Sequence, residues 1–273
     1  MSADRGMTQL RDVFAAGRAD GRALLVGYLP AGFPSLDGCV EAFEVLAAAG
    51  VDVFEVGLPY SDPLMDGPVI QTAVQQALDS KVGTADVLDT VRRIVAATGV
   101  PTVVMTYWNP VERYGVERFA ADLAAAGGAG VVTPDLLPEE AGDWIAALSR
   151  HDLAPVFLVA PSSTEARLRV VADTNRGFVY AASTMGVTGA RDSVSDRAGE
   201  LVARLRAVTD IPVAVGLGVS TGHQARQVAS YADGVIVGSA LVRALLSPPE
   251  GVAPKDALRE LAVELAAGVR GAG

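Results

Sequence analysis

The most informative stretch of the chain reads FEVGLPYSDPLMDGPVIQ and covers residues 54–71. It begins inside an apolar run, 51–58, that is typical of a buried strand and carries Glu55 in its middle. A turn rich in Pro, Ser, Asp and Gly follows and adds Asp62 and Asp66. Burying a carboxylate is unfavourable unless it is paired or used, so Glu55 is either half of a core salt bridge or a functional group. If Glu55 and Asp66 share a pocket, unlike surroundings can give them different protonation states, as acid–base chemistry requires.

Around this stretch, short apolar runs alternate with longer segments of helical spacing. We expect strands at residues 23–29, 52–58, 102–107, 130–134, 155–160, 178–183, 212–216 and 234–237. Runs that are apolar throughout suit parallel strands buried on both faces. Eight βα repeats close a (β/α)8 TIM barrel, whose functional residues lie at the carboxyl ends of the strands. A doubly wound open sheet is the alternative, but the first turn, YLPAGFP at 28–34, lacks the expected glycine-rich fingerprint.

We expect one α/β domain covering residues 1–273, because no linker or shift in composition divides the chain. An extra N-terminal helix lies within residues 1–22, the barrel occupies 23–246, and a C-terminal helix covers 254–270. Between the strands, helices are expected at 36–49, 69–79, 85–98, 116–126, 139–150, 163–173, 194–208 and 221–230.

Composition restricts the possible partners and the compartment. Half of the 273 residues are hydrophobic and the net charge is −10, which argues against nucleic acid and anionic membranes as partners. The chain opens with a polar, amphipathic segment rather than a signal peptide, and its apolar runs are too short to span a membrane. The single cysteine, Cys39, cannot form an internal disulfide. These features together predict a cytoplasmic protein.

The residues at the strand ends predict a pocket with three kinds of wall. Tyr28, Met105 and Tyr180 supply an aromatic and apolar side, and Glu55 with Asp66 an acidic side. Glycine-rich loops supply the third side, where backbone N–H groups and a helix N-terminus can bind a phosphate, or where the glycines only make tight turns. The phosphate candidates are Gly189, Gly218, Gly238 and Ser239.

Missing residue types narrow the chemistry further. Neither lysine, Lys81 or Lys255, stands at a strand end, which argues against Schiff-base and pyridoxal chemistry. The two histidines, His151 and His223, cannot form a metal cluster with the strand-end acids, so no metal site is expected. Metal-free acid–base chemistry on a phosphorylated, partly aromatic substrate remains. The long loop that contains Thr188 is either a lid over this substrate or a static surface loop.

At these motifs the chain resembles the α subunit family of tryptophan synthase. The likeness runs in order along nearly the whole chain. That family splits indole-3-glycerol phosphate into indole and glyceraldehyde 3-phosphate, a retro-aldol cleavage in tryptophan biosynthesis. The matching pieces are residues 55–68, the run 105–110 (MTYWNP), 134–136 (PDL), 186–189 (GVTG), and the pairs Gly216/Gly218 and Gly238/Ser239.

The resemblance implies a role for each site residue. Glu55 falls on the family's catalytic glutamate, which moves protons at the indole ring carbon and at the glycerol hydroxyl. Asp66 falls on the catalytic aspartate, which stabilises positive charge at the indole N–H. We expect burial to raise the pKa of Glu55. We expect Asp66, which lies on a loop, to stay ionised. The family's indole-binding positions fall on Tyr28, Met105 and Tyr180, and the threonine of its mobile loop falls on Thr188. Its phosphate-binding positions fall on Gly189, Gly218, Gly238 and Ser239.

The resemblance also implies a partner. The family works in an α2β2 assembly, in which a pyridoxal-phosphate-dependent β subunit receives indole through a tunnel. No cofactor is then expected in this chain, and Pro59 and Asp62 lie on a loop expected near the partner. An indole-glycerol-phosphate synthase would need a strand-end lysine, which is absent. A non-catalytic subunit that binds the ligand and regulates its partner is a further alternative, against which the intact Glu55 and Asp66 argue.

Overall fold

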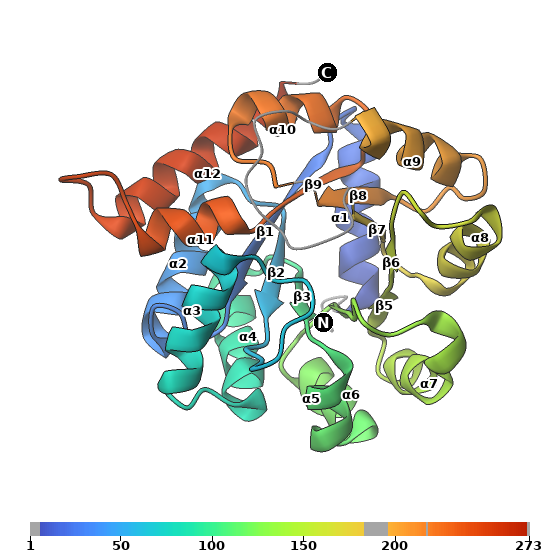
Figure 1. Cartoon of the computed structure of the whole chain (residues 1–273), viewed down its shortest axis with the longest axis horizontal. Helices are drawn as coiled ribbons and strands as arrows, with labels where there is room; N and C mark the ends of the chain where they lie inside the picture. The colour runs from blue at the N-terminus through green and yellow to red at the C-terminus, as the bar shows by residue number, and fades with distance from the viewer. Residues whose placement is uncertain (1–5, 183–195, 217, 272–273) are drawn as a thin grey trace.

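The computed structural model describes residues 6–182, 196–216 and 218–271. Its strands are all parallel and form one sheet in the order β5-β4-β3-β2-β1-β9-β8-β7-β6. Figure 1 shows these strands at the centre of the molecule with helices around them. The strands are β1 (Leu24–Pro30), β2 (Val53–Gly57), β3 (Thr102–Met105), β4 (Gly130–Val132), β5 (Ala154–Val156), β6 (Leu158–Val159), β7 (Val179–Ala182), β8 (Val213–Gly216) and β9 (Gly234–Val237).

The helices that follow the strands cover the outside of the sheet (Figure 1). They are α2 (Leu36–Ala49), α3 (Pro68–Asp79), α4 (Thr84–Thr98), α5 (Trp108–Tyr114), α6 (Val116–Ala125), the 3₁₀ turn η1 (Pro138–Glu140), α7 (Gly142–Arg150), α8 (Glu165–Thr174), α9 (Asp196–Arg206), α10 (Gly222–Ala229), α11 (Ser239–Leu246) and α12 (Pro254–Arg270). One further helix, α1 (Met7–Ala19), precedes the first strand.

The fifth predicted strand is present as two pieces, which are also the two ends of the sheet. Only Phe157 separates β5 from β6, so the ends meet and the sheet forms the nearly closed barrel that the sequence predicts. The break is caused by the buried side chain of Asn175. Its Oδ1 accepts a hydrogen bond from the Phe157 N–H (2.8 Å), and its Nδ2 donates to the Phe157 carbonyl (2.9 Å). These bonds replace the sheet hydrogen bonds that Phe157 would otherwise make.

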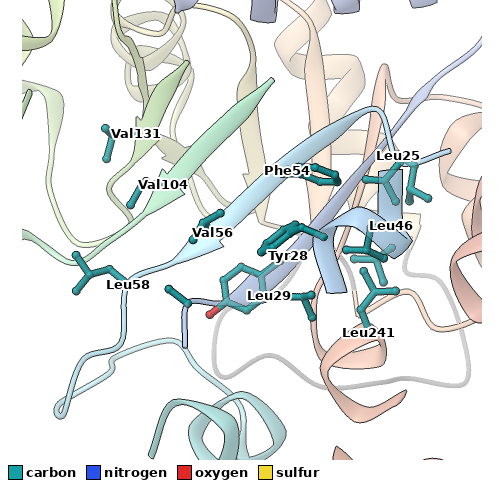
Figure 2. Close-up of a cluster of buried hydrophobic side chains, with 14 of the residues drawn as sticks. Leu25, Tyr28, Leu29, Leu46, Phe54, Val56, Leu58, Val104, Val131 and Leu241 are labelled. Atoms are coloured by element: carbon teal, nitrogen blue, oxygen red, sulfur yellow. The ribbon is translucent and has the colours of Figure 1, made fainter. Parts of the chain in front are cut away.

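Alternate residues of each strand face the helices or the barrel interior. Figure 2 shows the outer layer: Leu25 and Leu29 of β1 and Phe54 of β2 pack with Leu46 of α2 and Leu241 of α11. This layer is continuous around the described part of the barrel and fixes each helix over its strands. The strands are thereby held in register, which places the residues at their carboxyl ends beside one another.

The barrel interior is filled at its amino-terminal end. Leu10 and Phe14 of α1 are buried in one cluster with Leu24, Val26 and Phe178. The Phe14 and Phe178 rings lie with their centroids 5.4 Å apart. Figure 1 shows α1 crossing the strands instead of joining the surrounding helices. The extra N-terminal helix therefore closes the amino-terminal end of the barrel and leaves the carboxyl end as the accessible one.

The predicted helices include no range for α11, and two further helical regions differ from the prediction. The single helix expected at 139–150 is a 3₁₀ turn followed by α7, which begins at Gly142, a residue that stabilises helices poorly. The sequence also predicts no helix over 108–114, where the structure has α5. The N–H of Trp108 at its start donates to both carboxylate oxygens of Asp135, each at 3.0 Å. Because this cap comes from the loop after β4, local sequence gives no sign of it.

Candidate active site

A cavity of about 760 Å³, its open mouth included, lies at the carboxyl ends of the strands. It brings together eight of the predicted site residues, taken from β1, β2, β3, β7 and the segments after β2, β8 and β9. The predicted Thr188 and Gly189 lie outside the described residues. The lining residues are Tyr28, Glu55, Met65, Asp66, Ile70, Met105, Val132, Leu158, Tyr180, Ala182, Gly216, Gly218, Ile236, Gly238 and Ser239.

Glu55 projects into this cavity from the middle of β2. It pairs in register with Tyr28 of β1 and Val103 of β3, so its side chain lies on the inner face of the barrel. Its exposed fraction is 2%, and its Oε1 has no hydrogen-bond partner among the described residues. Burial, followed by the charge of Asp66, raises the pKa of Glu55 from 4.5 to about 8. Glu55 is therefore a protonated acid near neutral pH with an oxygen available to a ligand.

Asp66 lies between β2 and α3 and faces the same cavity. It is outside regular structure, as expected, but it is only 7% exposed. The Tyr107 hydroxyl donates to its Oδ1 at 3.3 Å, and Gln71 Nε2 donates to its backbone carbonyl at 2.7 Å. Burial raises the pKa of Asp66, and the Tyr107 hydrogen bond opposes this rise. The carboxylate that the sequence expects to stay ionised on its loop is thus buried and bonded by a tyrosine.

The core salt bridge considered from the sequence is not present in the described part of the chain. No Lys, Arg or His there pairs with Glu55 or Asp66; the ion pairs lie elsewhere, largely on the surface. Burial raises the pKa of both acids, and the charge of Asp66 adds to the rise at Glu55, because no cation in the described residues offsets it. This is the arrangement that acid–base chemistry uses.

Two tyrosines form the aromatic wall, and glycines at the strand ends make room for them. A Cβ atom on Gly57 would lie 2.3 Å from the Tyr28 hydroxyl, and one on Gly216 would lie 2.7 Å from the Tyr180 hydroxyl. A Cβ on Gly238 would lie 3.1 Å from Cδ1 of Tyr28. Burial and the nearby carboxylates raise the pKa of both tyrosines well above 10, so both hydroxyls stay protonated. The wall is flat, apolar and suited to a planar ring.

The glycine-rich side of the cavity contains the start of α11. Ser239 is the first residue of that helix and is buried, and Gly238 precedes it. Gly218 has φ of 70°, a left-handed conformation that glycine adopts readily. Free backbone N–H groups at a helix start, together with the helix dipole, form a site for an anion. This side of the cavity is the one best suited to a phosphate.

The two residues predicted to face a partner lie outside the cavity. Asp62 is exposed and its Oδ2 accepts a hydrogen bond from the Ser61 hydroxyl (2.6 Å), whereas Pro59 is buried beside a surface groove. Of the two, only Asp62 therefore belongs to the exposed surface of this loop. Leu64 on the same loop is 70% exposed.

Sequence reasoning missed some residues of the site. Val132, Leu158, Ala182 and Ile236 lie at inward positions of their strands and could have been found from the period of two. Tyr107 is different, because it reaches Asp66 from 41 residues away. Its signals are an aromatic side chain two positions after β3 and its place in the run 105–110.

The described ranges hold no group of three His, Cys, Asp or Glu side chains placed to bind a metal ion. None of the helices in those ranges combines the length and the apolar character that crossing a bilayer requires.

These features are those of a (β/α)8-barrel enzyme, with two buried carboxyl groups in one cavity at the carboxyl ends of its strands. A family profile described as "Tryptophan synthase alpha chain" matches residues 14–268. The chain belongs to this family, whose members are lyase subunits of tryptophan biosynthesis. The resemblance seen at the motifs is thereby confirmed.

Individual relatives are similar over nearly their whole length. The tryptophan synthase alpha chain of Nocardia farcinica is 58% identical over 265 residues, which are 97% of each chain. A solved structure of Mycobacterium tuberculosis tryptophan synthase has 55% identity and a TM-score of 0.90, covering 98% of this chain and 99% of that one. An alpha chain structure from Legionella pneumophila, 30% identical, covers 99% of both chains with a TM-score of 0.88. The barrel is thus shared even where the sequences differ widely.

Proposed function

We propose that this chain cleaves indole-3-glycerol phosphate to indole and glyceraldehyde 3-phosphate, with Glu55 and Asp66 as its catalytic residues. The observation that carries the proposal is the unpartnered Oε1 of the buried Glu55, which faces a cavity that also contains Asp66. An unpaired polar atom at this depth is unfavourable and is expected where a substrate supplies the partner.

The cavity orients such a substrate from its two ends. The phosphate binds at Gly218, Gly238 and Ser239, where the dipole of α11 favours negative charge, with Gly189 added from the loop after β7. The indole lies against Tyr28, Met105 and Tyr180. Thr188, on the loop that is expected to close, is proposed to help position Asp66. In this orientation the carbon–carbon bond to be broken lies beside Glu55.

The first step protonates the indole ring. Glu55, which is protonated near neutral pH because its pKa is about 8, donates a proton to ring carbon 3. Positive charge then develops at the ring nitrogen, whose N–H donates a hydrogen bond to the Asp66 carboxylate. Since both groups are buried, this attraction is stronger than it would be in water. The protonated ring can now accept an electron pair.

The second step breaks the bond. The Glu55 carboxylate removes the proton of the hydroxyl on the carbon attached to the ring. The oxygen lone pair forms a carbonyl, and the carbon–carbon bonding electrons return to the ring and neutralise its nitrogen. Glu55 is reprotonated by the hydroxyl proton, while the proton that it gave stays on the ring carbon, so no net proton is exchanged with solvent. The products are indole and an aldehyde that still bears the phosphate.

We further propose a β subunit as the partner of the chain, in an α2β2 assembly. The M. tuberculosis structures are of tryptophan synthase, and one of them is an aminoacrylate-bound form. Pyridoxal phosphate belongs to the β subunit, and this chain needs no cofactor of its own. Exposed Asp62 and Leu64 are available for a contact on the loop after β2, in which Pro59 is buried. We also propose that the chain forms a single domain and that it is cytoplasmic. The second proposal rests on the lone buried Cys39, which has no disulfide partner in the chain.

The test is release of indole by purified variants, with and without a β subunit. Glu55→Gln keeps the size of the side chain but cannot cycle a proton, so indole release should be abolished while substrate still binds. Asp66→Asn should slow the reaction by about a hundredfold or more. Glu44→Gln, at an exposed position on α2, is the matched control and should behave as wild type.

Full activity of Glu55→Gln would refute the assignment. A change of less than about threefold in Asp66→Asn would limit that residue to a structural role. If the wild-type chain releases no indole even with the β subunit, the alternative of a regulatory, non-catalytic subunit would be favoured instead.

A further inference from the structure

The Tyr107 hydroxyl connects two adjacent residues of the loop after β2. It accepts a hydrogen bond from the Met65 N–H at 3.0 Å and lies 3.3 Å from Asp66 Oδ1. An N–H can only donate, so the hydroxyl oxygen acts as acceptor toward Met65 and its own proton is left for Asp66. The direction of the hydrogen bond between Tyr107 and Asp66 is therefore fixed by the backbone of the loop itself.

Tyr107 stands behind Asp66 and away from the substrate space. It is buried, yet it is not among the residues that line the cavity. Its ring packs against Tyr60 with the centroids 5.4 Å apart, and the Tyr60 hydroxyl accepts a hydrogen bond from Asn109 Nδ2 at 3.0 Å. These contacts hold the Tyr107 hydroxyl in place, so its influence on the reaction passes through the two loop residues that it bonds, Met65 and Asp66.

Asp66 faces other acids and no cation among the described residues. The titratable groups around it are Glu55 from β2, Tyr28 from β1, Tyr180 from β7 and Tyr107 after β3. In the described ranges, Tyr107 is the side chain seen to donate to its carboxylate, since Gln71 bonds the backbone carbonyl instead. Without this donor, a buried carboxylate beside Glu55 would turn freely and favour its neutral form.

We propose that Tyr107 is a positioning residue, which keeps the Asp66 carboxylate ionised and aimed into the cavity before substrate binds. This inference rests on the proposed function, because it assigns to Tyr107 the preorganisation of a proposed catalytic group. It makes the connection after β3 part of the active site, although no atom of Tyr107 touches the substrate.

The test is Tyr107→Phe, which removes only the hydroxyl. A hydrogen bond to a charged group is strong, but this one is long, so we expect kcat to fall about tenfold with KM within about twofold. Asp66 has to be ionised, and loss of the donor raises its pKa. The acidic side of the rate profile should therefore move to higher pH. Tyr114→Phe is the matched control, because its hydroxyl donates to Asp122 Oδ2 and contacts neither Tyr107 nor Asp66.

Two further measurements separate positioning from a general effect on the fold. In an Asp66→Asn background, Tyr107→Phe should cause no additional loss, since both changes remove the same interaction. A ¹³C titration of the labelled Asp66 carboxyl in the ligand-free chain should show a higher pKa in Tyr107→Phe than in wild type, whatever the activity. An unchanged titration, a tenfold loss that persists without Asp66, or an effect on KM alone would overturn the inference. Failure of the proposed function itself would show separately, as wild-type activity in Asp66→Asn.

Discussion

At the scale of single residues, Glu55 links the chemistry of the site to the stability of the fold. Its pKa in the folded chain is about 8, against 4.5 for the ordinary carboxyl. Between these values the folded state keeps the proton and the unfolded state has lost it, so the unfolded state binds fewer protons. Stability contributed at this residue therefore decreases as pH rises from about 4.5 to about 8. A tenfold change in proton affinity corresponds to about 1.4 kcal/mol, so the total effect on the free energy of unfolding is a few kcal/mol.

Glu55→Gln should remove this dependence, because the amide has nearly the same shape and does not ionise. We expect the variant to unfold at a higher temperature than wild type at pH 8, and the difference to shrink toward pH 5. Thermal denaturation followed by circular dichroism across that range is the measurement, with Glu44→Gln as the exposed control on α2. A variant that is less stable than wild type at pH 8 would show that the Glu55 carboxyl is stabilised by contacts other than those described.

The two acids could be predicted from the sequence, whereas the contacts that bury and position them could not. Glu55 and Asp66 lie eleven positions apart in one motif. A carboxylate in an apolar strand, and another after a Pro- and Gly-rich turn, are local signals. The burial of Asp66 and its bond to Tyr107 depend on how β2 and β3 lie side by side, which only the folded sheet determines.

At the scale of elements, the fifth strand shows where a periodic pattern is insufficient. The apolar run at 155–160 predicts one continuous strand, and the positions of all eight predicted strands are confirmed. The hydropathy pattern does not predict the break at Phe157. Asn175, which causes the break, lies 18 residues away, after α8. Asn175 Nδ2 also lies 3.2 Å from the Phe178 carbonyl, just before β7. One amide thus connects the two pieces of the strand to the next strand.

Asn175→Leu should therefore destabilise the chain strongly. The substitution leaves the N–H and carbonyl of Phe157 buried without partners, and each such group is worth about 1–3 kcal/mol. We expect the free energy of unfolding in urea to fall by about 3–5 kcal/mol. Asn109→Ala, which removes one hydrogen bond at the surface, should cost less than about 1 kcal/mol. Equal losses for the two variants would contradict the structural role of Asn175.

At the scale of the whole molecule, the barrel is closed at one end and open at the other. Leu10 and Phe14 of α1 fill the amino-terminal end, while Glu55 and the glycine loops surround the cavity at the carboxyl end. The sequence predicts the extra helix from its apolar period. The place where it packs could not be predicted, because an apolar helix face indicates that the helix is buried but not which surface covers it. Residues that stabilise the barrel therefore lie at its amino-terminal end, and residues that act on the substrate lie at its carboxyl end.

Phe14→Ala tests this separation. The ring is buried against Phe178, and removal of a buried phenylalanine side chain usually costs about 3–5 kcal/mol. We expect a fall of this size in the free energy of unfolding, with kcat and KM for indole release within about twofold of wild type at temperatures where the variant stays folded. Val263→Ala, at a half-exposed position of α12, is the control and should change stability little. A Phe14→Ala chain that remains folded but loses indole release would show that α1 acts on the cavity through the barrel interior. The two ends would then be coupled through the packed side chains between them, and the interior would have to be treated as part of the active site.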